Sequence, residues 1–320
     1  MSHETNTIVR NPKGASFGLG RIVAINQKTV HVFFPARNAK EALRFAATTP
    51  FEPVENDDSE MFVWLSNLAA LRWHNERWVL SADVVTHQES VAKFHRVFPG
   101  GFAGDTYRTH ERDYKLAAHE RWRSALGDGQ AEALLKAGEL AELCQRMKRV
   151  IQPLNLLSRF ESSALSDALK DVASATAFLD AVVRFSQGTT AGTQGAFETL
   201  VEATASLPVT NSPVLRWPVV TLFPFCADPN RHVFVKPEVT KAAAARVGFE
   251  LHYQSKPNWT TYSAVTELAR YLNRRLTNDG AQDFIDAQSF MWSVVHYDDP
   301  GLTPPNADQR TPPNTDNADG

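Results

Sequence analysis

The segment that most constrains the fold of this chain is Thr29–Phe34, which reads TVHVFF. In an extended chain, two valines and a phenylalanine of this segment fall on one side, and His31 and Phe33 fall on the other. This two-residue period is typical of a β-strand that is half-buried. We therefore expect a small sheet near the start of the chain.

Neighbouring segments supply the other strands of that sheet. Gly18 and Gly20 bracket the start of a strand, and the polar turn Asn26-Gln27-Lys28 separates this strand from the alternating segment. The predicted strands are residues 21–25, 29–34, 41–46 and 51–54. Short strands joined by tight polar turns are typical of a small barrel. Residues 1–55 are therefore predicted to form a small β-barrel.

A second β-like stretch follows a charged gap at residues 55–60. Its expected strands are residues 70–73, 76–80 and 84–97, with a turn at His74-Asn75. From Thr106 to Leu126 the residues Glu, Arg, Lys and Ala dominate, which favours a helix. Residues 56–126 are therefore predicted to hold a second barrel and its exit helix.

The rest of the chain completes an α+β fold with a central helical region, residues 127–207, and a mixed α/β C-terminal domain, residues 208–298. The expected helices are residues 130–150, 154–172, 176–185, 195–205, 240–247 and 262–276. The expected buried strands are residues 214–225, 232–235 and 249–253. Residues 299–320 are rich in proline, asparagine and aspartate, so we predict a disordered tail there.

Charge and composition exclude several functional classes. The formal net charge of -3 argues against a protein that coats nucleic acid by bulk electrostatics, although residues 1–54 carry seven cations against three acids. The opening residues lack the apolar core of a signal peptide, and no apolar run approaches the roughly 18 residues of a membrane span. Cys144 and Cys226 are too few for a zinc knuckle or a disulfide framework. We therefore expect a cytoplasmic protein with two buried thiols, no membrane contact and no cofactor.

Three sequence features near the N-terminus belong together. They are the pattern G-L-G-x-[IV]-V-A at Gly18–Ala24, the pattern T-V-x-x-x-F-P at Thr29–Pro35, and a later strand that ends near Val54. Through these features the segment resembles the first Tudor-like subdomain of the RapA (HepA) family, the RNA-polymerase-associated SWI2/SNF2 ATPases of bacteria. The stretch Leu71–Val97 is similar to that family's second Tudor-like subdomain, and residues 102–123 are similar to the helical exit from it.

The resemblance implies that residues 1–55 form an SH3-like, Tudor-like β-barrel. It also implies a contact and regulatory module that binds partners and carries no catalytic residues. It covers about the first 125 residues, the length of one domain and well short of the whole chain. Residues 130–298 resemble no family. The sequence lacks the phosphate loop G-x-x-x-x-G-K-[ST], so the ATPase motor of the family is absent. A barrel of this size fills its interior with its own side chains, which leaves its edges and loops for recognition.

Four basic residues of the predicted barrel are candidates for partner contacts: Arg21, Lys28, Arg37 and Arg44. They suit the phosphate groups of a nucleic acid or an acidic surface of the polymerase. The alternative is that they form only the solvated side of a half-buried sheet. Single charges are common there and do not by themselves indicate a binding site.

The aromatic residues of the predicted barrel have two interpretations. Phe17, Phe33 and Phe34 suit either an aromatic recognition pocket or the core of a small domain. The preference of phenylalanine for burial favours the core. His31 faces away from the buried valines and has no partner at metal-ligand spacing, so we expect it to be exposed or interfacial.

In the C-terminal domain, Lys236, Asp283 and Asp286 are candidates for a metal-dependent nuclease centre, in which carboxylates hold the cation and lysine stabilises developing charge. The alternative is that the two aspartates, three residues apart, cap and charge the start of a helix. Lys236 and Trp259 are further candidates for contacts with a partner or with nucleic acid. The simpler interpretation of Trp259 and Trp292 is that they anchor a core or an interface.

These observations favour a binding protein over an enzyme. The leading hypothesis is an accessory protein that docks on RNA polymerase or on a separately encoded SWI2/SNF2-type helicase, or on nucleic acid. One alternative is a metal-dependent nucleic-acid-processing enzyme, for example in phage defence, with its site in the C-terminal domain. Another is a plain DNA-binding module, whose affinity falls steeply with salt.

Overall fold

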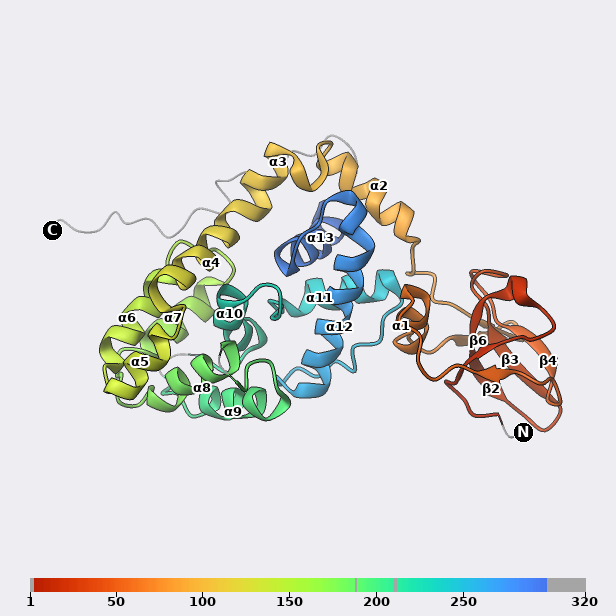
Figure 1. Ribbon diagram of the computed structural model, residues 1–320, viewed down its shortest axis with the longest axis horizontal. Helices are drawn as coiled ribbons and strands as arrows, with labels where there is room; N and C mark the ends of the chain where they lie inside the picture. The colour runs from red at the N-terminus through yellow and green to blue at the C-terminus, as the bar shows by residue number, and fades with distance from the viewer. Residues whose placement is uncertain (1–2, 188, 210–211, 298–320) are drawn as a thin grey trace. The chain divides into compact units, whose positions relative to one another are not determined.

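The computed structural model describes residues 3–187, 189–209 and 212–297 and shows a mixed α+β protein in which helices predominate (Figure 1). The described residues form two compact units. Unit 1 comprises the residues up to Glu89 together with Ala244–Leu251, and unit 2 comprises the remainder. The predicted tail, residues 299–320, lies outside the described residues.

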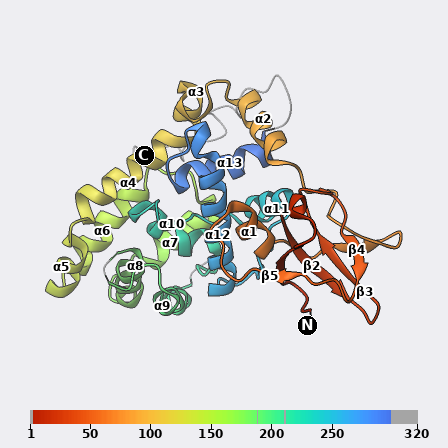
Figure 2. The same cartoon turned by 45° about the vertical axis from the view of Figure 1, so that its right-hand side comes forward.

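Unit 1 is built on a five-stranded antiparallel sheet with the strand order β4-β3-β2-β1-β5 (Figure 2). The strands are β1 (Ile8–Arg10), β2 (Leu19–Ile25), β3 (Thr29–Phe33), β4 (Leu43–Ala46) and β5 (Glu52–Pro53). The four strands that the sequence predicted in this region are confirmed, with small differences at their ends. Strand β1 was not predicted, because its three residues are too few to show a period.

Both faces of this sheet are buried near its centre. Val30, Val32 and Phe34 belong to one buried apolar cluster, whereas Phe33 belongs to a second cluster that includes Leu65 of helix α1 (Glu60–Ser66). The alternation predicted for β3 is therefore confirmed. The core interpretation of the phenylalanines is confirmed as well: Phe33 and Phe34 are fully buried, and the half-buried ring of Phe17 packs 5.3 Å from that of Phe34.

The second barrel expected over residues 56–126 is wrong, although two of its expected strands, 70–73 and 76–80, and the exit helix are present. This range contains only a two-stranded ribbon, β6 (Arg72–His74) and β7 (Arg77–Val79), and then helices. The ribbon extends the first sheet, because the amide of Ala42 donates to the carbonyl of Trp78 over 2.9 Å, and the amide of Leu80 donates to that of Lys40 over 2.8 Å.

The strand expected at residues 84–97 is helix α2 (His87–Val97) instead. Thr86 and Glu89 form a reciprocal capping box, in which the Thr86 hydroxyl accepts from the Glu89 amide and the Glu89 carboxylate accepts from the Thr86 amide. Buried Ser90 and Phe94 then recur four residues apart, the spacing of one helix face. The cap and this spacing together outweigh the apparent strand character.

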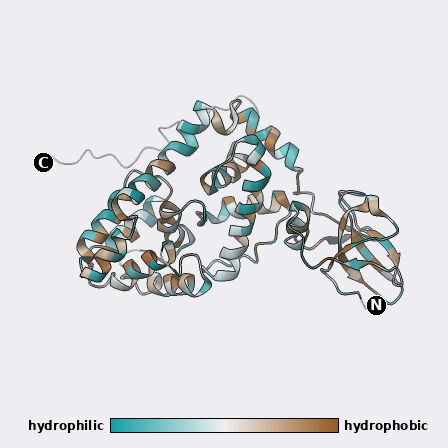
Figure 3. Ribbon diagram, viewed as in Figure 1, coloured by the Kyte–Doolittle hydropathy of each residue, from teal (hydrophilic) through white to brown (hydrophobic). Residues whose placement is uncertain are grey.

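Unit 2 consists of helices, many of which carry both hydrophobic and hydrophilic residues (Figure 3). They are α3 (Asp105–Tyr107), a π-helical turn (Arg108–Arg112), α4 (Asp113–Leu126), α5 (Gln130–Ala137), α6 (Leu140–Ile151), α7 (Arg159–Ala168), α8 (Thr176–Ser186), α9 (Gln194–Ala205), α10 (Trp217–Ala227), α12 (Trp259–Leu276) and α13 (Phe284–His296). Short 3-10 turns lie at Ala15–Phe17, Gly101–Ala103 and Thr277–Asp279. Helix α11 (Pro237–Val247) runs from unit 2 into unit 1. The individual helices predicted after the exit helix are confirmed, except that residues 130–150 form two helices, α5 and α6. Both cysteines are buried free thiols.

The strands predicted for the mixed α/β domain, residues 208–298, are wrong within the described part of that range. Trp217–Ala227 is helix α10, residues 232–235 form no strand, and Phe249 makes only an isolated bridge. Helix α10 is apolar almost all round, so its sequence has no helical period that would distinguish it from a buried strand. Pro218 fits because it lies in the first turn, where its missing amide hydrogen is not needed. Within the described residues, no helix has both the length and the apolar composition of a membrane-spanning segment.

Candidate functional site

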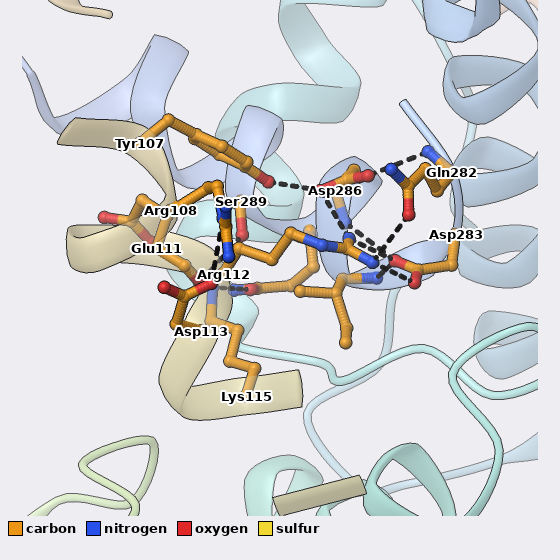
Figure 4. A network of polar contacts seen from close by, with 12 residues as sticks. Tyr107, Arg108, Glu111, Arg112, Asp113, Lys115, Gln282, Asp283, Asp286 and Ser289 are labelled. Atoms are coloured by element: carbon orange, nitrogen blue, oxygen red, sulfur yellow. Dashed lines mark hydrogen bonds and ion pairs between the residues drawn. The ribbon is translucent and has the colours of Figure 1, made fainter. Parts of the chain in front are cut away.

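A network of buried polar and charged side chains joins the start of α4 to α13 in unit 2 (Figure 4). Its members on the first side come from α3, the π-helical turn and α4, and those on the second side come from α13 and its flanks. They are Tyr107, Glu111, Arg112, Lys115, Asp283, Asp286, Gln288, Ser289 and Tyr297. We call this set the buried ion network. A π-helical turn is rare, and such turns are frequent at functional positions, so the local backbone marks this region.

Arg112 holds both aspartates that the sequence singled out. Its guanidinium donates to the two carboxylate oxygens of Asp283 over 3.0 and 2.8 Å, and it lies 2.7 Å from a carboxylate oxygen of Asp286. Asp283 also accepts from the amides of Ile285 and Asp286, over 2.9 and 3.3 Å. The helix-cap interpretation of this aspartate pair therefore agrees with the structure, with Asp283 as the N-cap of α13.

The charges of this pair are balanced in a buried environment. Burial raises the pKa of Asp286, against the hydrogen bond that it accepts from the Tyr107 hydroxyl over 2.5 Å and the nearby charge of Arg112. Burial alone would lower the pKa of Arg112, but the hydrogen bonds and charges of Asp283 and Asp286 raise it. The guanidinium therefore stays protonated, and the amide of Gln282 donates a further hydrogen bond to Asp286 over 2.8 Å.

The second half of the network is centred on Lys115. Its ammonium donates to Gln288 over 2.6 Å, to Ser289 over 2.8 Å and to Glu111 over 3.3 Å. The hydroxyl of Tyr297 donates to the other oxygen of Glu111 over 2.5 Å. Because these groups pair across the two helices, they fix the register of α13 against α4.

The structure separates the third nuclease candidate, Lys236, from the aspartates. The Lys236 ammonium lies 5.0 Å from the ring centre of Trp292, which is nine positions beyond Asp283 and about 13 Å further along α13. Burial lowers the pKa of Lys236. Among residues 3–187, 189–209 and 212–297, no group of three or more histidine, cysteine, aspartate or glutamate side chains is placed to hold a metal ion.

Trp259 lies in an aromatic cluster of unit 2. Its half-buried ring packs 5.9 Å from Phe197 and 6.0 Å from Tyr262. Phe197 and Tyr262 stack on each other at 4.5 Å. The position of Trp259 thus matches the anchor interpretation of the sequence.

The four basic candidates of unit 1 do not form one patch. Arg21 is engaged within the unit: its guanidinium donates to Asn6 over 2.8 Å and to the carbonyls of Leu65, over 3.1 Å, and Leu68. Burial lowers the pKa of Arg21, and the negative charge of Glu250 partly offsets this decrease. Arg21 therefore ties β2 to the end of α1.

The other three basic candidates are exposed. Lys28 lies in the turn between β2 and β3, whereas Arg37 lies in the loop after β3, with its guanidinium 5.8 Å from the ring centre of Phe17. The length of β3 separates these two cations. Arg44 lies on β4, directly opposite His31 of β3.

Arg44 borders a group of aromatic side chains that the sequence analysis missed. Trp73 and Trp78 are directly opposite each other in the β6–β7 ribbon, with ring centres 5.4 Å apart, and the ring of His31 lies 6.1 Å from that of Trp73. We call these three residues and Arg44 the aromatic–basic face. The available signal was RWHNERW, two tryptophans at equivalent places around a short turn.

The described residues thus offer two candidate sites. In the buried ion network each charged side chain is paired within the protein. In the aromatic–basic face Trp73 and Arg44 are exposed, so this site is open to a partner. No protein-family model matches the chain, and no curated protein or solved structure matches it either.

Proposed function

We propose that this chain is a non-enzymatic binding protein that docks on RNA polymerase, or on a SWI2/SNF2-type helicase that works with it, through unit 1. The support is the resemblance of residues 16–54 to the first Tudor-like subdomain of the RapA family. Those residues supply strands β2 to β5. We infer that the sheet of unit 1 is the counterpart of that Tudor-like barrel.

The observation that carries this proposal is the filled interior of the sheet. Val30, Val32, Phe33 and Phe34 are fully buried, so the strands use their inward faces for their own packing. Recognition then falls to the exterior, as expected for so small a β unit. Exposed basic side chains lie on the strands and turns at the exterior of the sheet, where they can pair with an acidic protein surface.

The test is co-elution of the full chain with purified RNA polymerase, and separately with a purified SWI2/SNF2-type helicase, at low salt. We expect a complex with one of them, and we expect Lys28→Glu combined with Arg37→Glu to abolish it. The matched control is Arg159→Glu, which reverses an exposed cation of unit 2 and should leave binding unchanged. Failure of the unaltered chain to co-elute with either machine would reject the proposal.

The alternative of a metal-dependent nucleic-acid-processing enzyme stays a prediction. A cation at Asp283 and Asp286 would have to displace Arg112, which already contacts both carboxylates. Incubation of the protein with DNA or RNA and magnesium or manganese tests this alternative. Cleavage that disappears in Asp283→Ala would favour it over the docking proposal.

A further inference from the structure

We propose that the aromatic–basic face of unit 1, formed by His31, Arg44, Trp73 and Trp78, binds single-stranded nucleic acid by stacking unpaired bases on Trp73. This site goes beyond the docking proposed above and does not depend on it. The docking test uses Lys28 and Arg37, neither of which belongs to the face.

The geometry of the ribbon presents Trp73 to solvent. Asn75 and Glu76 both have positive φ angles, 46° and 60°, as in the two-residue turns whose twist matches that of a hairpin. The turn sets Trp73 directly opposite Trp78, and Trp78 packs against the apolar cluster that contains Phe33. One tryptophan is thus anchored in the core while the other rests on it with 55% of its surface exposed.

Beside Trp73 lie two more flat side chains held by the sheet. The His31 ring stands at 89° to the Trp73 ring, and Arg44 faces His31 across the β3–β4 pair. Indole, imidazole and guanidinium groups are the side chains on which unpaired bases stack in single-strand-binding proteins. Paired β-strands carry all three side chains and limit their motion. The entropy lost by these side chains when a nucleic acid binds is therefore small.

The local charge selects an anionic ligand. Burial and then the positive charge of Arg44 lower the pKa of His31, so this imidazole is neutral at pH 7 beside a charged guanidinium. An aromatic site that takes an ammonium ligand would be opposed by Arg44, because like charges repel. A phosphate backbone is attracted instead.

The polarity of the surroundings favours nucleic acid over an apolar protein surface. Trp73 is the most exposed large hydrophobic side chain in the described part of unit 1, and its sequence neighbours Arg72 and His74 are exposed polar residues. Protein contact patches usually offer a contiguous apolar area, whereas a single exposed aromatic ring within polar surroundings suits one base.

The test measures fluorescence anisotropy of labelled oligo(dT) and oligo(U), each about 16 nucleotides long to cover a full single-strand site. The full chain should bind both, since stacking tolerates any base. Trp73→Ala should weaken binding by about 5- to 150-fold, because stacking on one side chain contributes this much per base. Trp73→Phe should retain most of the affinity. The matched control, Phe160→Ala, removes an aromatic ring on α7 that is 81% exposed and should have no effect.

A second variant keeps the inference testable if Trp73→Ala perturbs the ribbon. Arg44→Gln leaves the tryptophan pair intact and should weaken binding. The plot of log affinity against log salt concentration should become less steep by about one unit, the value for one lost phosphate contact. Thermal melting of each variant checks that its fold is retained.

Three results would overturn the inference. The first is no binding of either oligonucleotide at about 50 mM salt, where phosphate contacts are strong. The second is unchanged affinity in both Trp73→Ala and Arg44→Gln. The third is loss of polymerase co-elution in Trp73→Ala while the unaltered chain binds no oligonucleotide, which would make the face a protein contact and leave the docking proposal standing.

Discussion

Arg112 and Asp283 are 171 positions apart in the chain, yet their side chains form a two-fold hydrogen-bonded ion pair with nitrogen–oxygen distances of 2.8 and 3.0 Å. The pair joins the π-helical turn before α4 to the first turn of α13. Both side chains are at most 10% exposed, so removing them from water is costly unless each charge keeps its partner. The pair thus stabilises one register of these helices, because any other register would leave buried charges without a partner.

Replacement of Arg112 by alanine should destabilise the protein by about 3–5 kcal/mol, because two buried carboxylates lose their counter-charge. Urea denaturation monitored by circular dichroism measures this loss. The control is Arg108→Ala in the same helical segment, which removes an exposed pair with Asp113 and should cost much less. Equal losses for the two variants would contradict a structural role for the buried ion network.

The two carboxylates of this network illustrate what a sequence can predict. The spacing of Asp283 and Asp286 is enough to suggest a helix start, because capping depends on residues close in the chain. Their partner Arg112 could not be found in the same way, since its place beside them depends on how the π-helical turn packs against α13. The nuclease candidate Lys236 did not join them for the same reason: opposite charges in separate segments of the sequence need not meet in the fold.

The fold shows the same division between local and tertiary signals. Strands β2 to β5 of unit 1 were predictable because polar turns separate them and β3 has a clear two-residue period, whereas β1 is too short to show one. Helix α10 was mistaken for a strand because burial on every side removes the period that identifies a helix. The two tryptophans of the ribbon became a candidate site only once their pairing across the turn, and their contact with His31, were known.

The stability of the protein should fall below neutral pH because of His232. Its ring is fully buried, Nδ1 lies 3.1 Å from the Tyr262 hydroxyl, and Nε2 has no hydrogen-bond partner in the described protein. Burial, and then the charge of Arg231, lower the pKa of His232 to about 3. The unfolded state, with a pKa of about 6.5, therefore binds a proton that the folded state does not.

The expected contribution of His232 is complete above pH about 6.5 and declines as the pH falls towards 3, by at most about 1.4 kcal/mol per pH unit. Denaturant titrations between about pH 8 and about pH 4, which cover most of the interval between the unfolded and folded pKa values, measure this slope. His232→Gln should flatten it, while His74→Gln, at an exposed position in the ribbon, should not. An unchanged slope in His232→Gln would show that another group controls the acid sensitivity.

The N-terminal unit should be incomplete without the distant segment Ala244–Leu251. The amide of Ala69 donates to the carbonyl of Gly248 over 2.8 Å, and the indole of Trp64 donates to that of Val247, also over 2.8 Å. A fragment of residues 1–89 lacks these acceptors and also lacks the buried side chain of Phe249. We expect it to melt at a lower temperature than unit 1 within the full chain.

Amide hydrogen exchange localises this effect. The Ala69 amide should exchange faster in the fragment than in the full chain, whereas the amides of β3, which pair with β2 and β4, should stay protected in both. Equal protection of the Ala69 amide in the two proteins would mean that unit 1 folds without the distant segment.

The two glycines that open β2 should be needed for different reasons. Gly18 has a φ of +68°, which only glycine adopts without strain, so Gly18→Ala should cost about 1 kcal/mol through its backbone. Gly20 has no such angle, but a β-carbon there would lie 2.4 Å from a ring carbon of the fully buried Phe34. Gly20→Ala should therefore cost about 1–3 kcal/mol through overpacking.

A double-variant cycle distinguishes these causes. Phe34→Leu removes the ring that the new methyl group would meet, so it should reduce the cost of Gly20→Ala, whereas it should leave the cost of Gly18→Ala unchanged. Gly195→Ala is the control, because no atom lies near its β-position in α9 and helix propensity favours alanine there. If the effects of Gly20→Ala and Phe34→Leu simply add, the close approach to Phe34 does not explain the glycine.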